Sequence, residues 1–143
     1  MIQVTKFHPA YCWPLLQHDP FGSFAQEEAI ERMADSPYAI AILGDDKVVA
    51  CAGVVEHWPG RGEAWSMWHP EATFCERVAG IRAIKRNLDA CPLRRVESTV
   101  QIDNEAGHRL SLLLGFEEEC RLMRHYLPNG MCATLYVRLK KNG

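Results

Sequence analysis

The alternation of apolar and polar residues predicts several short strands in the first half of the chain. Gly44-Asp45-Asp46-Lys47 has the length and composition of a hairpin turn between two β-rich runs. Proline and glycine interrupt the pattern again at residues 58–62, where we expect a second turn. The strands predicted in this half are residues 2–7, 38–43, 48–56 and 63–68.

Helical spacing of apolar residues predicts helices on either side of this hairpin. Pro9 and Pro14 bracket one helical segment, and residues 25–34 form another, with Ser23 and Gln26 in capping-box spacing. The longest helix is predicted at residues 72–88, with one apolar face. That face consists of Phe74, Val78, Ile81, Ile84 and Leu88. Gly80 lies within this helix and indicates close packing there, because glycine in a helix costs about 1 kcal/mol relative to alanine.

The carboxy-terminal part is predicted as strand, helix and hairpin. A strand at residues 96–102 precedes a helix at 104–114, which Asp103 or Asn104 caps and Gly115 ends. Two further strands, 116–124 and 131–139, flank a turn at 127–130. The helix residues expected to face the core are Leu110, Leu113 and Leu114. The element order predicts an α/β (α+β) fold with a mixed, mostly antiparallel central sheet and flanking helices.

Length and charge narrow the class of protein. The chain of 143 residues fits one domain, 1–143, and its net charge of −2 argues against a nucleic-acid partner. No apolar run approaches the roughly 20 residues that cross a bilayer, so no membrane association is expected. The amino terminus lacks the apolar core of a secretory signal. We therefore expect a cytoplasmic protein.

The six cysteines predict neither disulfides nor a metal site. They are spread along the chain without a CxxC pair, and most stand beside apolar residues. The six histidines are also scattered, and His57 and His69 have no third ligand at useful spacing. Small buried side chains in a reducing compartment are the expected role of the cysteines.

The run Arg94–Asn104, followed by Leu110 and Gly115-Phe116, resembles the GNAT superfamily of N-acetyltransferases. In that family a strand, an asparagine, a helix with small and apolar positions and a terminal Gly-Phe follow one another. Gly107 stands where alanine is usual. The run from Gly53 to Trp65 also resembles small GNAT-like proteins encoded in bacteriophage genomes, some of which are virion proteins.

The resemblance implies a binding site for acetyl-CoA between two splayed middle strands, 63–68 and 96–102. Its pantetheine arm resembles an extended peptide and pairs with free backbone groups, as in strand addition. No metal is implied. The residues expected on the cofactor side are the backbone of Trp65, Ser66 and Met67 and the side chains of Asn104 and His108. Arg77, or alternatively Arg82 or Lys85, could supply charge for the phosphates.

Two features depart from the family pattern. The family binds pyrophosphate with an (Arg/Gln)-x-x-Gly-x-(Gly/Ala) loop before the long helix, and no such loop is present. Residues 77–82 match its first four positions, but Arg82 replaces the small residue. Ser111 stands where many members have a tyrosine that acts as general acid.

Candidates for proton transfer remain at other positions. Glu63 or Glu56 could take the proton of an ammonium group, directly or through a water. An acid could be Tyr126, Tyr136, His108 or water. Trp58, Trp65, Trp68 and Met67 cluster around the middle strands, as core or as the lining of an acceptor groove.

Three functions are compatible with the sequence. The first is an N-acetyltransferase that moves an acetyl group from acetyl-CoA to an amine of a small molecule or protein. The second is a catalytically degenerate GNAT-fold protein with a structural role, such as a component of a phage particle, and the third is a phage protein that acts on a host protein. The apolar middle strands also allow a homo-oligomer.

Overall fold

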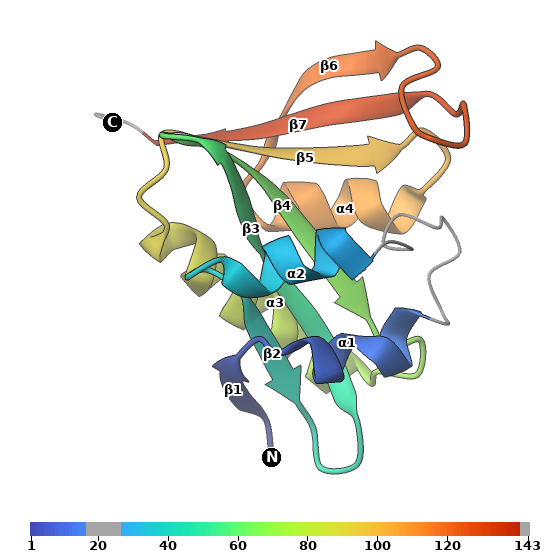
Figure 1. The fold of residues 1–143 in the computed structure, drawn as a ribbon. Helices are drawn as coiled ribbons and strands as arrows, with labels where there is room; N and C mark the ends of the chain where they lie inside the picture. The colour runs from blue at the N-terminus through green and yellow to red at the C-terminus, as the bar shows by residue number, and fades with distance from the viewer. Residues whose placement is uncertain (17–26, 141–143) are drawn as a thin grey trace. The chain divides into compact units, whose positions relative to one another are not determined.

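Seven strands form one hydrogen-bonded sheet in the order β1-β2-β3-β4-β5-β7-β6 in this computed structural model, which describes residues 1–16 and 27–140 (Figure 1). β4 and β5 pair in parallel, whereas β1 with β2, β2 with β3, β5 with β7 and β6 with β7 pair antiparallel. The elements are β1 (Gln3–Lys6), α1 (Pro9–Leu16), α2 (Glu27–Asp35), β2 (Ile40–Leu43), β3 (Val48–Trp58), β4 (Arg61–Trp68), α3 (Phe74–Ala90), β5 (Arg95–Gln101), α4 (Glu105–Leu113), β6 (Glu117–Met123) and β7 (Ala133–Leu139). The predicted class, a mixed and mostly antiparallel sheet with flanking helices, is confirmed.

The chain divides into two compact units. The first comprises residues 1–55 and 64–91, and the second comprises residues 56–63 and 92–143. Strands β3 and β4 therefore each contribute residues to both units. The expectation of one domain, 1–143, stays a prediction.

In the first unit, consecutive strand residues point to opposite faces of the sheet, as the pleat requires. Ala41, Cys51 and Met67 face a core that α1 and α2 close with Cys12, Leu15, Ile30 and Met33. Ile42 and Trp68, each one residue further along its strand, face α3, where both approach Gly80. Figure 1 shows α1 and α2 on one side of these strands and α3 on the other.

Gly80 packs directly against the Trp68 ring of β4. A Cβ atom on this residue would lie 2.9 Å from two ring carbons of Trp68. The prediction of close packing is confirmed, because no larger side chain fits without moving the indole.

Helix α3 begins at a capping box that the apolar pattern alone did not locate. Thr73 Oγ1 accepts the Glu76 N–H at 3.1 Å, and Glu76 Oε1 accepts the Thr73 N–H at 2.8 Å. The Thr-x-x-Glu spacing of this capping box is visible in the sequence as Thr73 and Glu76. The prediction that Phe74 belongs to a buried apolar face of this helix is wrong, because Phe74 occupies the first helical position and is 80% exposed.

In the second unit, α4 packs against β5, and β7 lies between β5 and β6. Asn104 caps α4 as predicted, and Gly115 ends it with φ +91°. The core prediction for Leu113 is wrong, since 59% of it is exposed, whereas Leu114 is buried. Within α4 the buried residue is Ser111.

The strand bounds shift by a few residues from the predicted ones. The turn expected at 58–62 shrinks to Pro59 and Gly60, since Gly60 adopts φ +91° and lets β3 and β4 extend to either side. The proposed cap at Ser23 and Gln26 lies outside the described residues.

Candidate functional site

The parallel register between β4 and β5 is short. It joins Arg61, Gly62 and Glu63 to Arg95, Val96 and Glu97. Beyond Glu63, β4 runs on to Trp68, and beyond Glu97, β5 runs on to Gln101. The point where the register ends therefore carries an acidic residue on each strand.

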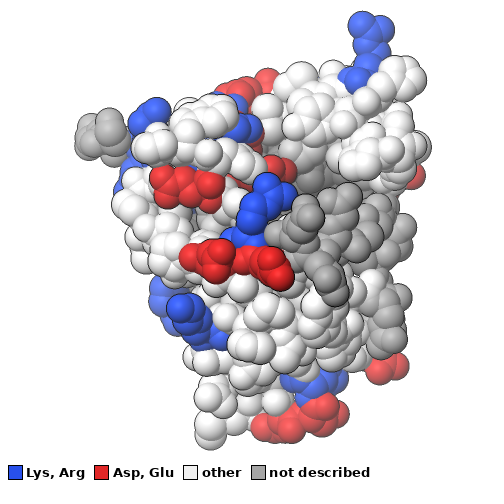
Figure 2. Space-filling model, viewed as in Figure 1, with Lys and Arg blue, Asp and Glu red and all other residues white. Residues whose placement is uncertain are grey.

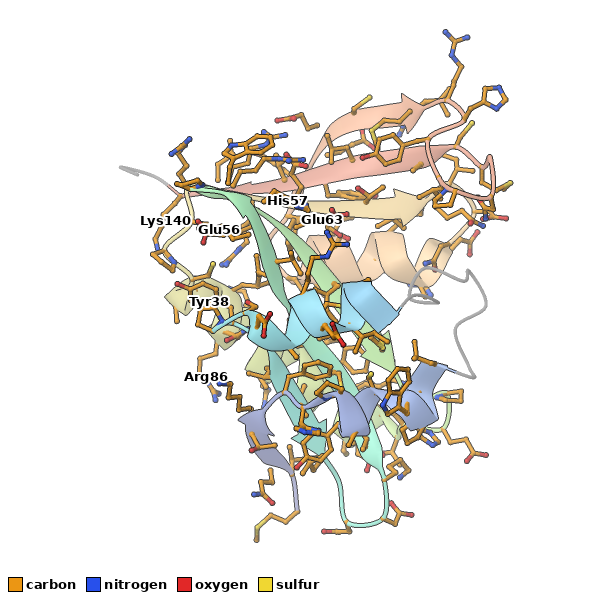
Figure 3. All side chains as sticks on the ribbon, in the orientation of Figure 1. Tyr38, Glu56, His57, Glu63, Arg86 and Lys140 are labelled. Carbon is orange, nitrogen blue, oxygen red and sulfur yellow. The ribbon has the colours of Figure 1, made fainter. Side chains whose placement is uncertain are left out.

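Glu63 forms a polar pair with His57 in the second unit. The distance from His57 Nε2 to Glu63 Oε2 is 3.0 Å, and Figure 3 shows the two side chains side by side. Both are partly open to solvent, with side-chain exposures of 31% and 43%. If Nε2 donates to the carboxylate, Nδ1 is left as an acceptor, which is the arrangement of a histidine base oriented by a carboxylate.

Glu56 and Tyr126, the other predicted proton-transfer residues, are both exposed. Glu56 stands one residue before His57 on β3. Tyr126 lies in the connection between β6 and β7, with 55% of it exposed. The hydrogen bonds of the described residues do not join either of them to the His57–Glu63 pair.

A buried carboxylate next to this pair holds two strands together. Glu97 is 8% exposed and accepts from Arg61 Nη2 at 2.6 Å, Arg61 Nε at 2.8 Å and Arg95 Nε at 2.7 Å. Hydrogen bonds from Arg61 and then Arg95 hold the pKa of Glu97 at about 2. Arg95 also donates to both carboxylate oxygens of Glu119 on β6. This network fixes the start of β4 against β5.

The side-chain carbonyl oxygen of Asn104, a predicted cofactor ligand, caps the start of α4. Its Oδ1 accepts the Gly107 N–H at 3.0 Å. A Cβ on Gly107 would lie 2.7 Å from Asn104 Nδ2 and 2.8 Å from Val100 Cγ1. The crowding explains why glycine replaces the usual alanine here, and it leaves the Asn104 amide NH₂ as the group that could reach a ligand.

Ser111, in the position of the family's tyrosine, faces the sheet. It is 4% exposed, and its Oγ lies 3.4 Å from Ser98 Oγ on β5. A buried hydroxyl held by another hydroxyl is a packing contact, so the structure gives Ser111 no role as an acid.

His108 is engaged at both ring nitrogens. Its Nε2 lies 3.0 Å from the carbonyl oxygen of Ile102, and its Nδ1 lies 2.7 Å from the Tyr136 hydroxyl. Because a carbonyl only accepts, Nε2 carries a proton, and in the tautomer protonated only there, Nδ1 accepts from the Tyr136 hydroxyl. Burial raises the pKa of Tyr136, which is 5% exposed. A cofactor could engage His108 only by displacing one of these partners.

The aromatic and sulfur side chains of the middle strands divide between core and surface. Met67 is buried, and the Trp65 ring packs edge-on against Phe7 with centroids 5.1 Å apart. Trp58 is 55% exposed, and Arg61 lies over its ring at 4.3 Å. Core packing holds for Met67, Trp65 and Trp68, whereas Trp58 is a surface residue.

Arg77 lies in the first turn of α3 and is exposed. Its guanidinium folds back toward the carbonyl oxygen of Pro70 at 3.5 Å. The run from Arg77 to Arg82 forms continuous helix, with Gly80 packed against Trp68. It is therefore not a phosphate-binding loop.

The structure brings one of the predicted residues into a local group with residues that were not predicted. Glu63 lies near the register end, together with His57, Glu97, Arg61 and Arg95. His57 was considered from the sequence only as a metal ligand, because its contact with Glu63 depends on how β3 and β4 lie beside each other. The pairing of Glu97 with two arginines depends on strand register, which no local pattern shows.

Metal ligands and membrane segments were not expected. Among residues 1–16 and 27–140, no three His, Cys, Asp or Glu side chains form a possible metal-binding group. None of the helices in these ranges combines the length and apolar composition of a membrane span.

All six cysteines are free, and three of them, Cys12, Cys51 and Cys91, are buried. Figure 2 shows acidic and basic side chains interspersed over the visible face.

No protein-family model and no curated protein sequence matches this chain. Solved structures do match it, and they define the fold as that of the GNAT acetyltransferases. Ard1 from Thermoplasma volcanium aligns with a TM-score of 0.78 at 14% identity, covering 96% of this chain and 97% of that chain. A GNAT-family acetyltransferase from Bacillus cereus aligns at 0.71 and 14% identity, covering 98% of each chain.

A third structure, yncA from Salmonella typhimurium, was determined with its cofactor acetyl-CoA. It aligns with a TM-score of 0.75 at 12% identity and covers 99% of this chain and 95% of that chain. At these identities the likeness concerns the fold. The resemblance to phage-encoded proteins stays a prediction.

Proposed function

We propose that this chain is an N-acetyltransferase that transfers an acetyl group from acetyl-CoA to a primary amine of a small molecule or protein. The observation that carries the proposal is the three-residue parallel register of β4 and β5, in a fold shared with acetyltransferases. Strand backbone beyond that register is suited to pair with the amide-bearing pantetheine arm of the donor. We assign this contact to the backbone of Trp65, Ser66 and Met67.

The reaction needs a base but no nucleophile from the enzyme. The amine attacks the thioester carbonyl, so that a C–N bond forms while the C–S bond breaks. The ammonium group must first lose a proton. We assign that proton to Glu63 acting with His57, because their 3.0 Å contact would place a carboxylate and an imidazole at the end of the register. Glu56 is the second choice.

The leaving thiolate takes up a proton at the end of the reaction. Tyr126 is the proposed donor, because it is exposed, whereas Tyr136 is buried and already donates to His108. Asn104 through its amide NH₂ and His108 are proposed to line the donor site, whereas Arg77 is turned toward Pro70 and is not assigned to it. The cytoplasmic location, the homo-oligomer and the structural role in a phage particle stay predictions.

Acetyl-CoA binding is the first test. A ligand that binds only the folded state stabilises it by about 2.7 kcal/mol at a hundredfold excess over Kd. A rise in melting temperature that grows with acetyl-CoA concentration is therefore expected. No shift at millimolar acetyl-CoA would contradict the proposed function.

Turnover of a panel of primary amines, followed by release of free thiol, tests the base. Glu63→Gln should lower kcat about 100-fold or more, since it cannot take a proton. His57→Gln should also lower kcat, Glu56→Gln tests the second choice, and Glu118→Gln, an exposed carboxylate on β6, serves as the matched control. Equal rates for wild type, Glu63→Gln and Glu56→Gln would reject both carboxylates as the base.

A further inference from the structure

The amino-terminal end of α3 is the natural place for phosphates in the first unit. β4 ends at Trp68, and α3 begins at Phe74 after only a short connection. A ligand extended along β4 would therefore reach the start of this helix. Free N–H groups and the helix dipole make such an end a binding site for anions.

Most N–H groups at this helix start are already occupied. Residue 70 is a proline and has none, and the amides of six other residues between 69 and 77 donate within the chain. Their bonds are His69 to Val49 O at 2.8 Å, Glu71 to His69 Nδ1 at 3.1 Å, Ala72 to His69 O at 3.1 Å, Thr73 to Glu76 Oε1 at 2.8 Å, Glu76 to Thr73 Oγ1 at 3.1 Å and Arg77 to Thr73 O at 2.9 Å. Among the described residues, only the N–H groups of Phe74 and Cys75 remain for a ligand in this stretch.

The charge at the helix start also opposes a phosphate. The Glu76 carboxylate takes the place that an anion would occupy, and it is held there by the Thr73 N–H and by Lys47 Nζ at 3.3 Å. Its side chain is only 15% exposed. A hollow of about 250 Å³ beside the helix start is lined by Asp45 and Glu76 among others. A phosphate entering it would meet carboxylates that already have cationic partners, Asp45 with the Met1 ammonium at 2.7 Å and Glu76 with Lys47, and Arg77 is turned toward Pro70.

From this closed helix start, we infer that the acyl donor is recognised through its thioester and pantetheine arm, with no contribution from nucleotide phosphates at α3. The donor class is then pantetheine thioesters in general, of which acetyl-CoA is one. This inference rests on the proposed function and specifies its donor.

Calorimetric titration of the full chain with three donors tests the inference. Acetyl-CoA, acetyl-phosphopantetheine and S-acetylpantetheine share the arm and thioester but differ in their phosphates. Their dissociation constants should agree within about threefold, and raising the salt concentration should change them little. Acetyl-CoA binding at least about tenfold tighter than S-acetylpantetheine would overturn the inference and leave the proposed function standing. Absence of binding by all three would overturn both.

A matched pair of variants tests the same point through the helix start. Glu76→Gln keeps the capping box, which accepts glutamine, but removes the charge. It should tighten acetyl-CoA binding by about threefold at most, the spread already allowed between the donors, and leave S-acetylpantetheine unchanged, because only the former has phosphates to repel. Glu71→Gln removes a nearby exposed charge outside the cap and should change acetyl-CoA binding less than about twofold. Weaker acetyl-CoA binding by Glu76→Gln, with S-acetylpantetheine unchanged, would show that the cap holds the nucleotide and would refute the inference.

Discussion

Glu97 offers a sharp test of how the second unit is held together. This carboxylate lies between the guanidinium groups of Arg61 and Arg95 and is 8% exposed. Replacing it by glutamine keeps the size of the side chain and removes its charge. Both arginines would then face a neutral amide on β5, and charge-assisted hydrogen bonds would be lost.

The size of the effect follows from the pKa of Glu97. The arginines, Arg61 first, lower it from 4.5 to about 2. Since one pKa unit corresponds to 1.36 kcal/mol, ionised Glu97 contributes about 3 kcal/mol to stability at neutral pH. A carboxyl whose pKa is lower in the folded state stabilises fully above its unfolded pKa. The contribution is therefore present above about pH 5 and is lost as the pH falls toward 2.

Urea denaturation followed by circular dichroism measures this contribution. At pH 7, Glu97→Gln should lower the free energy of unfolding by about 3 kcal/mol. At pH 3 the difference from wild type should be about 2 kcal/mol smaller, because Glu97 is then largely protonated in the unfolded state and its ionised form stabilises the folded state less.

A matched exposed pair provides the control. Glu118 lies 3.6 Å from Arg121, and both side chains are open to solvent. Glu118→Gln should change stability by less than about 0.5 kcal/mol at either pH. A Glu97→Gln difference that is the same at pH 7 and pH 3 would refute the pKa argument.

Two further substitutions test close contacts in each unit. Gly80→Ala should destabilise the protein by about 1–3 kcal/mol, because the new Cβ would lie 2.9 Å from the Trp68 ring; a rise in melting temperature would mean that helix propensity outweighs the clash. Tyr136→Phe should cost about 1–2 kcal/mol in urea denaturation, because His108 Nδ1 loses its donor. A loss below about 0.3 kcal/mol would mean that water replaces the hydroxyl.

Local patterns in the sequence predicted the elements and their order. The Gly44–Lys47 turn, the cap at Asn104 and the helix end at Gly115 all depend on residues adjacent in the chain, so they were legible without a structure. The capping box of Thr73 and Glu76 is equally local, but Thr73 lies just outside the stretch with helical apolar spacing.

Which side of an element faces the core was less predictable near its ends. Phe74 fits the helical period of α3 but occupies the first helical position, and Leu113 fits that of α4 but lies at its last residue. Periodicity assumes neighbouring layers along the whole helix. Phe74 lies at the start of α3 and is exposed, and at the end of α4 the buried residues are Ser111 and Leu114, which leaves Leu113 on the exposed side.

The chemistry of the candidate site depended on the tertiary structure. Sequence alone determined the mixed fold and proposed Glu63, since residue types and short spacings suffice for both. Tertiary structure decided that His57 contacts Glu63, that Glu97 is buried between two arginines, and that a carboxylate closes the start of α3. The first two contacts depend on strand register. The third contact joins Glu76 of the helix cap to Lys47, 29 residues away in the chain, and no local sequence pattern predicts a contact over that separation.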